Sequence, residues 1–229
     1  MAISTKPGGK YDTENGQYVS DGSSNAEIES EAKEYARKHQ MPSFPQTGQQ
    51  DDCLKEILDK KEFTKPPKRV NKEQFTKALE SGSVVYRGVG SSKHIEQFYN
   101  GDCFVGQGRL GNGIYMSYDK KEALGFSSNL VVSILPKDFN FAPTELRKEH
   151  EQFVKEFKTK RFSPEKVKTE DDMKEAQNEL NFINDFGKYC ALKGYDGYIT
   201  QDDKNLVVLN RGKLIIGEND EQRIFLEFD

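Results

Sequence analysis

The sequence predicts an α+β fold centred on a strongly twisted, mostly antiparallel sheet that is flanked by helices. Long helices are expected over residues 144–160 and 171–192, and short apolar strands lie on both sides of this pair. The regular strand–helix alternation of a doubly wound sheet is missing. The 229 residues suit one domain of ordinary size, and 15 Phe with 10 Tyr provide enough apolar surface for one core.

The first 50 residues predict a flexible polar leader ahead of a domain over residues 51–229. Their turn-forming and linker residues leave little apolar surface to bury. Residues 25–40 favour a charged helix with a thin apolar stripe, which consists of Ile28, Ala32, Tyr35 and Ala36. We expect the leader to be mobile or to dock elsewhere, so a chain that lacks residues 1–50 should still fold.

Short elements separated by polar breaks fill the first half of the domain. Asp51-Asp52 is expected to cap a short helix that ends before Lys65-Pro66-Pro67-Lys68. The next elements, in order, are a helix over 72–79, a strand over 84–87, a helix after Ser91-Ser92, a glycine-dense loop over 101–113, a strand over 113–117, a helix after Asp119 and a strand over 130–135.

The second half begins with the two long helices, and Lys193-Gly194 is expected to stop the second of them. Apolar residues recur at helical spacing in both. Four strands then follow, at 197–200, 206–209, 214–216 and 224–228.

Composition excludes several classes of function. A net charge of −4 and a pI near 5.6 argue against a non-specific binder of polyanions. No apolar run approaches the length of a membrane span. The three cysteines are far apart and only three histidines occur, so neither a disulfide framework nor a metal site is expected. This cysteine usage indicates a reducing, cytosolic environment.

Two nucleotide-binding motifs are excluded by their context. Gly212-Lys213 lacks the preceding glycine and the following Ser or Thr of a phosphate-binding loop. Residues 106–111 match Gly-x-Gly-x-x-Gly, but no apolar strand precedes them and a strand, not a helix, follows. A dinucleotide fingerprint requires the opposite order.

Three segments share one character, a short apolar strand with a polar residue and glycine beside it: residues 84–88, 111–117 and 203–210. The set resembles the ADP-ribosyltransferase superfamily over residues 80–217. Tyr86-Arg87-Gly88 is similar to the arginine form of its first motif, and residues 111–117 are similar to the Gly-x-Gly-Ile-Tyr-x-Ser motif of its polymerase-like branch. Gly194-Tyr195-Asp196-Gly197 and the strand after it resemble phage and mobile-element members.

The resemblance implies a split sheet of ADP-ribosyltransferase type, with NAD as the co-substrate and no metal. Arg87 would hold the phosphate or ribose of NAD. The backbone of Gly88 would meet the nicotinamide carboxamide, Tyr115 would stack on the nicotinamide ring, and Ser117 would support the site by hydrogen bonding. Gly113 closes the glycine-dense loop, which would wrap the dinucleotide.

One residue departs from the superfamily pattern. The third motif usually ends in a Glu before its apolar strand, whereas Asn205 stands here. Asn205, with Arg87 and Tyr115, completes the expected catalytic set. An amide keeps the hydrogen bonding of a carboxylate but loses its charge, so we expect slow turnover and a rate gain from Asn205→Glu. Asp203 and Glu227 are the other carboxylates considered.

The resulting hypothesis is a mono-ADP-ribosyltransferase that modifies a cytosolic macromolecule, with protein favoured over nucleic acid and no membrane partner. If the chain is encoded by a phage, the host cytosol is its expected location. One alternative is a weak or inactive NAD-site protein with a binding or structural role. Another is an NAD-degrading toxin of the RES type, for which Gly108-Arg109 would supply an arginine while Glu122 gives no clear match to its glutamate.

Each motif also has a purely structural interpretation. Arg87 is compatible with a strand-end arginine paired with a carboxylate, Tyr115 with a core residue, and residues 101–113 with a surface loop that has turn glycines. The order and strand context of the three motifs favour the NAD site.

Overall fold

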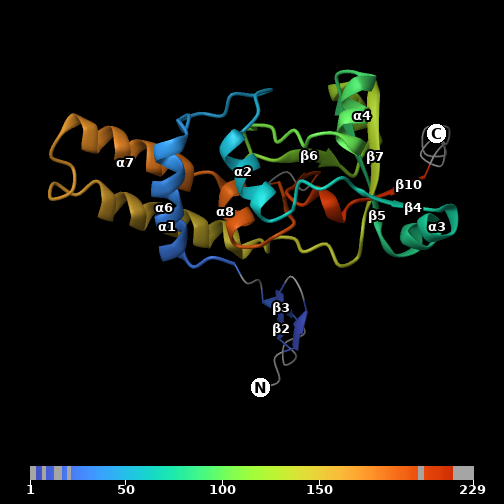
Figure 1. Cartoon of the computed structure of the whole chain (residues 1–229), viewed down its shortest axis with the longest axis horizontal. Coiled ribbons are helices and arrows are strands. Elements are labelled where there is room, and N and C mark those ends of the chain that lie inside the picture. The colour runs from blue at the N-terminus through green and yellow to red at the C-terminus, as the bar shows by residue number, and fades with distance from the viewer. Residues whose placement is uncertain (1–3, 7–8, 13–16, 20–21, 201–203, 219–229) are drawn as a thin grey trace.

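The computed structural model describes residues 4–6, 9–12, 17–19, 22–200 and 204–218, and it confirms the α+β class. Within these residues, seven strands form one sheet in the order β4-β10-β7-β5-β6-β9-β8, in which only the β4–β10 pair is parallel. Figure 1 shows the chain from the N-terminus in blue to the C-terminus in red. The expected strand at 224–228 lies outside the described residues.

The helices are α1 (Asn25–Lys38), α2 (Asp52–Lys60), α3 (Lys72–Ser81), α4 (Ser92–Asn100), α5 (Lys120–Phe126), α6 (Glu145–Arg161), α7 (Glu170–Ile183) and α8 (Phe186–Leu192). The strands of the large sheet are β4 (Lys68–Val70), β5 (Ser83–Val89), β6 (Ile114–Ser117), β7 (Asn129–Leu135), β8 (Gly197–Ile199), β9 (Asn205–Val208) and β10 (Ile215–Gly217). Three short strands that the sequence analysis did not predict, β1 (Ser4–Lys6), β2 (Gly9–Asp12) and β3 (Gln17–Val19), pair antiparallel with one another.

Several helix ends follow the expected capping chemistry. The Asp51 side chain accepts a hydrogen bond from the backbone N–H of Leu54 and so begins α2, while Ser91 and Asp119 cap α4 and α5 in the same way. The long helix expected over 171–192 is instead two helices. Asp185 caps α8 by accepting from the N–H of Lys188, which ends α7 and turns the chain.

The sheet is held unevenly along its width. β5 and β7 pair along seven residues, and β6 and β9 along four. Between these pairs, β5 and β6 are joined at a single residue pair, Tyr86 and Ser117. β7 and β10 are likewise joined at one pair, Ile134 and Ile215. The sheet therefore has a narrow join on each side of the well-paired strands β5 and β7.

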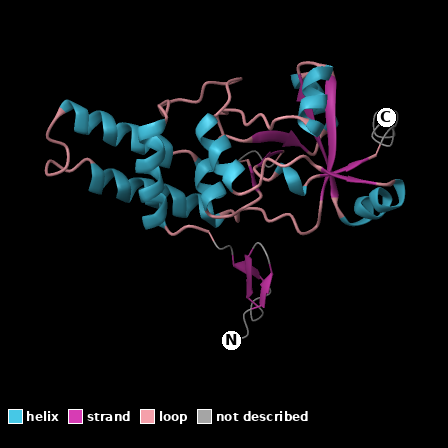
Figure 2. Cartoon of the chain, in the orientation of Figure 1, coloured by secondary structure: helices cyan, strands magenta, loops and turns pink. Residues whose placement is uncertain are grey.

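The two faces of β5 and β7 meet different layers. Val84 and Tyr86 pack with Ala123 of α5, and Ile134 packs with Phe75 of α3. Residues of the opposite face, such as Val85, lie in the main core. Figure 2 shows that α1, α2 and α6–α8 gather at one end of the molecule, whereas the long strands lie toward the other end with α3 and α4.

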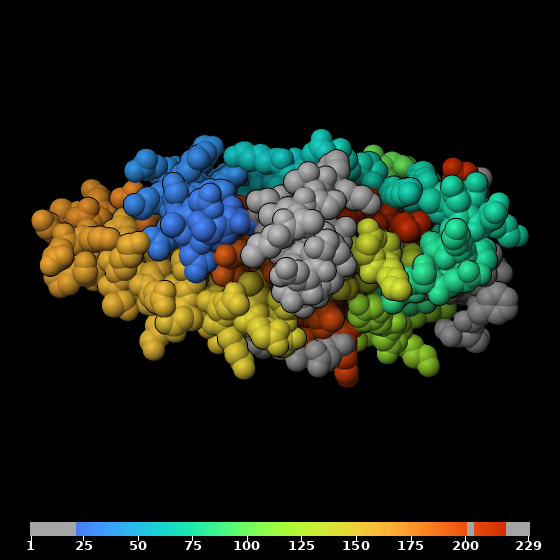
Figure 3. Space-filling view, turned by 90° about the horizontal axis from the view of Figure 1, so that it is seen from below, coloured from blue at the N-terminus to red at the C-terminus, as the bar shows by residue number. Residues whose placement is uncertain are grey.

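Helix α1 belongs to the main core, which differs from the flexible leader that the composition predicted. Ile28, Ala32 and Tyr35 are each no more than 2% exposed, and the Tyr35 ring stacks on Phe182 of α7 at 5.7 Å. Figure 3 shows α1 in blue packed beside the orange helices at that end. The thin apolar stripe of α1 is enough to hold the helix in the core, because α7 provides a complementary apolar face.

The chain after α1 is also fixed to α7. Asn178 accepts a hydrogen bond from the backbone N–H of Met41 at 2.6 Å and donates to the carbonyl of His39 at 3.0 Å, while Asn181 donates to the carbonyl of Met41 at 2.8 Å. The backbone N–H of Asp51 then donates to Val105 at 2.8 Å. Residues 25–51 are therefore part of the domain.

We predict that Tyr35→Ala lowers the free energy of unfolding by about 3 kcal/mol, because it opens a cavity beside Phe182. Urea unfolding followed by circular dichroism measures this change. A matched control is Phe44→Ala, since Phe44 is 80% exposed and its loss should cost less than about 0.5 kcal/mol. A chain that begins at residue 51 should be unfolded or strongly destabilised. Full stability of that shorter chain would contradict this description of α1.

Candidate active site

The three motif segments lie on neighbouring strands, although they are far apart in the sequence. β6 has β5 on one side and β9 on the other. Tyr86 pairs with Ser117, and Ser117 pairs with Asn205. These three residues thus form one row across the sheet, with their side chains on the same face, because directly paired residues share a face.

Arg87 lies on the opposite face from this row, since side chains alternate along a strand. It is half-buried and lines a cavity of about 350 Å³ together with Gly88, His94, Phe98, Asp102 and Phe104. Its Nη1 donates to the backbone carbonyl of Tyr115 at 3.3 Å, across the point where β5 and β6 diverge. The structure thus brings the Arg87 guanidinium to the backbone of β6 but not to the face of Ser117 and Asn205.

Gly88 has a structural reason to be glycine. A Cβ atom at this position would lie 2.3 Å from the carbonyl oxygen of Ala123 and 2.9 Å from the backbone nitrogen of Ser127. Helix α5 therefore packs directly on the backbone of β5, and the glycine permits that approach. The same close packing brings Glu122 of α5 next to the strands β6 and β9.

Tyr115 holds the glycine-dense loop. Its hydroxyl donates to the carbonyl of Gly111 at 2.6 Å and accepts from the backbone N–H of Leu110 at 3.1 Å. A Cβ atom on Gly108 would lie 2.3 to 2.5 Å from Tyr115 ring atoms and the hydroxyl, so the loop backbone rests on the ring. Gly113 closes the loop through paired backbone hydrogen bonds with Gly106 at 2.9 and 3.1 Å. In this arrangement the loop itself covers the Tyr115 ring.

Ser117, Asn205 and Glu122 form a polar cluster on the face covered by α5. The Asn205 amide donates to Glu122 Oε1 at 2.9 Å, and the Ser117 hydroxyl lies 3.4 Å from Glu122 Oε2 and 3.2 Å from the carbonyl of Lys204. The Ser117 oxygen also accepts from the N–H of Asp119 at 3.1 Å. From the sequence, Glu122 is considered only as a poor match to the RES-type glutamate, because no local signal shows that it reaches Asn205 on β9.

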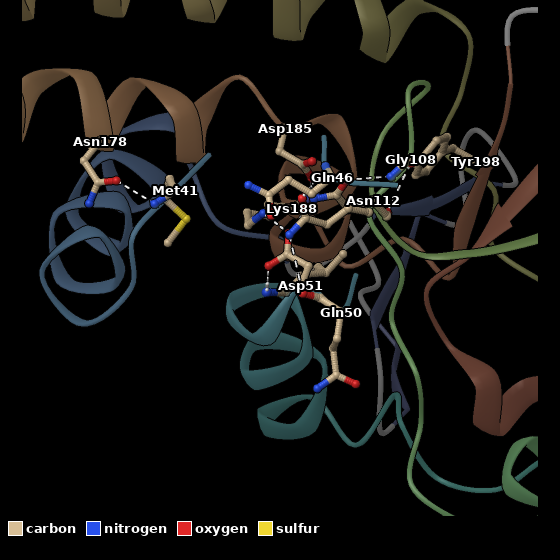
Figure 4. A network of polar contacts seen from close by, with 12 residues as sticks. Met41, Gln46, Gln50, Asp51, Gly108, Asn112, Asn178, Asp185, Lys188 and Tyr198 are labelled. Atoms are coloured by element: carbon tan, nitrogen blue, oxygen red, sulfur yellow. Dashed lines mark hydrogen bonds and ion pairs between the residues drawn. The ribbon is translucent and has the colours of Figure 1, made fainter. Parts of the chain in front are cut away.

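A buried charge network anchors the loop to the helical end of the molecule (Figure 4). The Lys188 ammonium forms an ion pair with Asp51, and the Asn112 amide donates to the same carboxylate at 2.5 Å. The Asn112 carbonyl oxygen Oδ1 accepts from the N–H of Gly108 at 3.1 Å. The side chains of Asp51 and Lys188 are 7% and 4% exposed. The sequence signal for this network is a lysine on the inward face of an otherwise apolar helix.

The electrostatics of the network favour the charged forms of Asp51 and Lys188. Burial alone would raise the pKa of the Asp51 carboxyl, but the Lys188 ammonium and the hydrogen bonds outweigh it and lower that pKa. Burial alone would lower the pKa of Lys188, but Asp185 and Asp51 raise it. Burial raises the pKa of Asp185, which lies on the other side of the ammonium. The cation thus outweighs burial at Asp51 and offsets it only in part at Asp185.

A second cavity of about 300 Å³ lies on the other side of the loop, between residues 107–112 and helices α6–α8. Arg109 and Arg147 line it, as does His150, whose Nε2 lies 2.8 Å from the carbonyl oxygen of Ile183. Burial lowers the pKa of His150, so its imidazole is neutral at pH 7. Arg109 and Arg87 therefore line different cavities, and the loop separates them.

The residues of the described ranges contain no helix long and apolar enough to cross a membrane, and no group of three or more His, Cys, Asp or Glu side chains placed to hold a metal ion. A comparison of the chain with family models, with curated proteins and with solved structures finds no match. The assignment of function therefore depends on the geometry of these residues.

We predict that Lys188→Met lowers the free energy of unfolding at pH 7 by about 3 to 5 kcal/mol, because it leaves two buried carboxylates without their cation. Lys55→Met is the matched control, since its ion pair with Asp59 at 2.8 Å is partly exposed and should contribute less than about 1 kcal/mol. Urea unfolding measures both.

The effect of Lys188→Met should depend on pH. Without the ammonium, burial raises the carboxyl pKa values above the unfolded value near 3.8. The destabilisation is then complete at neutral pH and is relieved as the pH falls toward that value. The difference from the wild type should therefore narrow on acidification, and a difference that stays constant would show that lost packing, not charge, is its cause.

Proposed function

We propose that the protein is an NAD-dependent mono-ADP-ribosyltransferase that uses the junction of β5, β6 and β9. The observation that carries the proposal is the adjacency of the three motif strands, with Tyr86, Ser117 and Asn205 in one row. The three motifs are far apart in the sequence, so they can form one site only if the fold brings their strands together, as it does here. The α+β class and the mostly antiparallel sheet agree with it.

The proposed reaction transfers ADP-ribose from NAD to a nucleophile on a macromolecule. The bond between the nicotinamide nitrogen and ribose C1′ breaks, and nicotinamide leaves as a neutral base with the bonding electron pair. The acceptor nitrogen or oxygen forms the new bond to C1′ and releases one proton. Positive charge develops on the ribose in the transition state, so the site must stabilise a cation on one side and the phosphates on the other.

Arg87 suits the phosphate or ribose side of the donor. Its guanidinium is planar, permanently charged and able to form paired hydrogen bonds, and it opens on a cavity whose volume of about 350 Å³ is at the lower end of small-molecule sites. Such a volume matches one nucleotide half of the dinucleotide. The other half would extend toward the junction that Arg87 spans with its hydrogen bond to Tyr115.

A second candidate function is NAD binding without turnover, which two contacts favour. Arg87 already has a structural partner in the Tyr115 carbonyl, and the Tyr115 ring is covered by Gly108 instead of facing an open cleft. The RES-type alternative has less support, because Arg87 and Arg109 line separate cavities.

We predict that NAD raises the melting temperature of the wild type and that Arg87→Ala removes this shift. Ligand at 100 times its Kd stabilises a folded protein by about 2.7 kcal/mol, which a thermal-shift assay detects readily. Arg87→Ala should itself cost about 1 kcal/mol through the lost hydrogen bond. Arg109→Ala, which changes an arginine in the other cavity, should keep the NAD shift.

Labelled NAD incubated with the protein and a lysate then separates the candidates. Label on a macromolecule supports transfer, release of free ADP-ribose supports hydrolysis, and a thermal shift without either supports binding alone. A wild type that shows no NAD shift would contradict the proposal and make Arg87 a purely structural residue.

A further inference from the structure

We infer that the cavity between residues 107–112 and helices α6–α8 is a binding site for a small oxyanion, a phosphate or carboxylate group held by Arg109 and Arg147. This cavity of about 300 Å³ is the one that the glycine-dense loop separates from Arg87. The inference goes beyond the proposed function and does not depend on it, because no step of the proposed transfer uses this cavity.

The arginines of the described residues differ in whether they have a partner, and this difference points to the cavity. Five of them have an acceptor in the described part of the chain: Arg37, Arg69, Arg87, Arg161 and Arg211. Arg109 and Arg147 have neither a hydrogen-bond acceptor nor an ion pair among the described residues. Both of them line this one cavity. Two guanidinium groups without acceptors at one cavity provide the donors that an anion needs.

The packing of Arg147 leaves its donors available. Arg147 is half-buried, and its guanidinium carbon lies 4.2 Å from the centroid of the Phe186 ring. Stacking on a ring uses the face of the planar guanidinium, whereas its N–H groups point outward in the plane. The group is therefore held in place by Phe186 while it can still bind an oxyanion through paired hydrogen bonds. Holding it in place beforehand also lowers the entropy cost of binding.

The negative groups of the cavity do not cancel this charge. Asp185 accepts from the backbone N–H of Lys188 at 2.8 Å and lies beside the ammonium of that lysine. Burial also raises the pKa of Asp185, which reduces its negative charge. Glu151 is exposed, so water screens it more than it screens the half-buried Arg147. The cavity is thus locally positive in a chain whose net charge is −4.

The rest of the lining indicates the size and character of the ligand. Met41, Pro42, Leu110 and Phe186 give the cavity an apolar wall beside the two arginines. Its volume is at the lower end of the range for small-molecule sites. A small organic phosphate or carboxylate, with a compact apolar body, suits both features.

Inorganic phosphate, titrated into the full chain, tests the inference. We expect it to raise the melting temperature by about 3 to 6 °C at ten times its Kd, relative to sodium chloride of equal ionic strength. Arg147→Met keeps an apolar stem over Phe186 but removes the donors, so it should weaken phosphate binding by about tenfold or more. Arg109→Met should weaken it several-fold. Succinate, tested in the same way, distinguishes a carboxylate site from a phosphate site.

Two arginines outside the cavity provide controls. Arg37→Met is the matched control, since Arg37 is exposed and pairs with Glu175 at 3.7 Å, and it should bind phosphate like the wild type. Arg87→Ala should keep at least half of the phosphate shift, because Arg87 lines the other cavity.

Three results would overturn the inference. The first is the absence of a shift with both phosphate and succinate. The second is a shift that disappears in Arg87→Ala but persists in Arg147→Met, since the anion would then occupy the other cavity. The third applies if Arg147→Met does not fold, and is an unchanged affinity in Arg109→Met, whose exposed side chain can be lost without harm to the core. A missing NAD shift would contradict the proposed function alone.

Discussion

The ammonium of Lys188 is the constraint on which the packing of three segments depends. Asp51 begins α2 and Asp185 begins α8, and both act on this one cation, while Asn112 of the glycine-dense loop donates to Asp51. Burying these carboxylates without a cation would remove a large part of the stability of an ordinary domain. The cation therefore stabilises the packing of the loop, α2 and α8 against one another. The position of Tyr115 follows from it, because that ring supports the same loop.

The candidate site has one charged side chain held in place on each face of the sheet. On the α5 side, neutral hydrogen-bonding groups fix a carboxylate beside the row of paired residues. On the other face, a guanidinium spans the junction and borders a cavity. Opposite charges thus stand on the two faces of the same narrow part of the sheet.

The sequence predicted the local elements well because their signals are local. Strands such as 84–87 and 206–209, and the caps at Asp51, Ser91 and Asp119, depend on residues within one or two turns. The sequence could not show that α1 joins the core, since its thin stripe becomes sufficient only against the face of α7. It could not show Glu122 beside Asn205 either, because 83 residues separate the two partners.

The single residue pair between β5 and β6 affects how firmly the sheet fixes these two strands against each other. Several consecutive backbone hydrogen bonds prevent one strand from rotating against its neighbour. A single residue pair, such as the one between β5 and β6, constrains this rotation at one point only. Beyond that pair, the Arg87 guanidinium donates to the Tyr115 carbonyl of β6, where a backbone hydrogen bond between β5 and β6 would otherwise lie. A side chain moves between rotamers far more easily than a ladder slides in register. The β5–β7 and β6–β9 pairs are therefore joined by backbone at one point and by one side chain beyond it, and a ligand that binds Arg87 would compete with this second link.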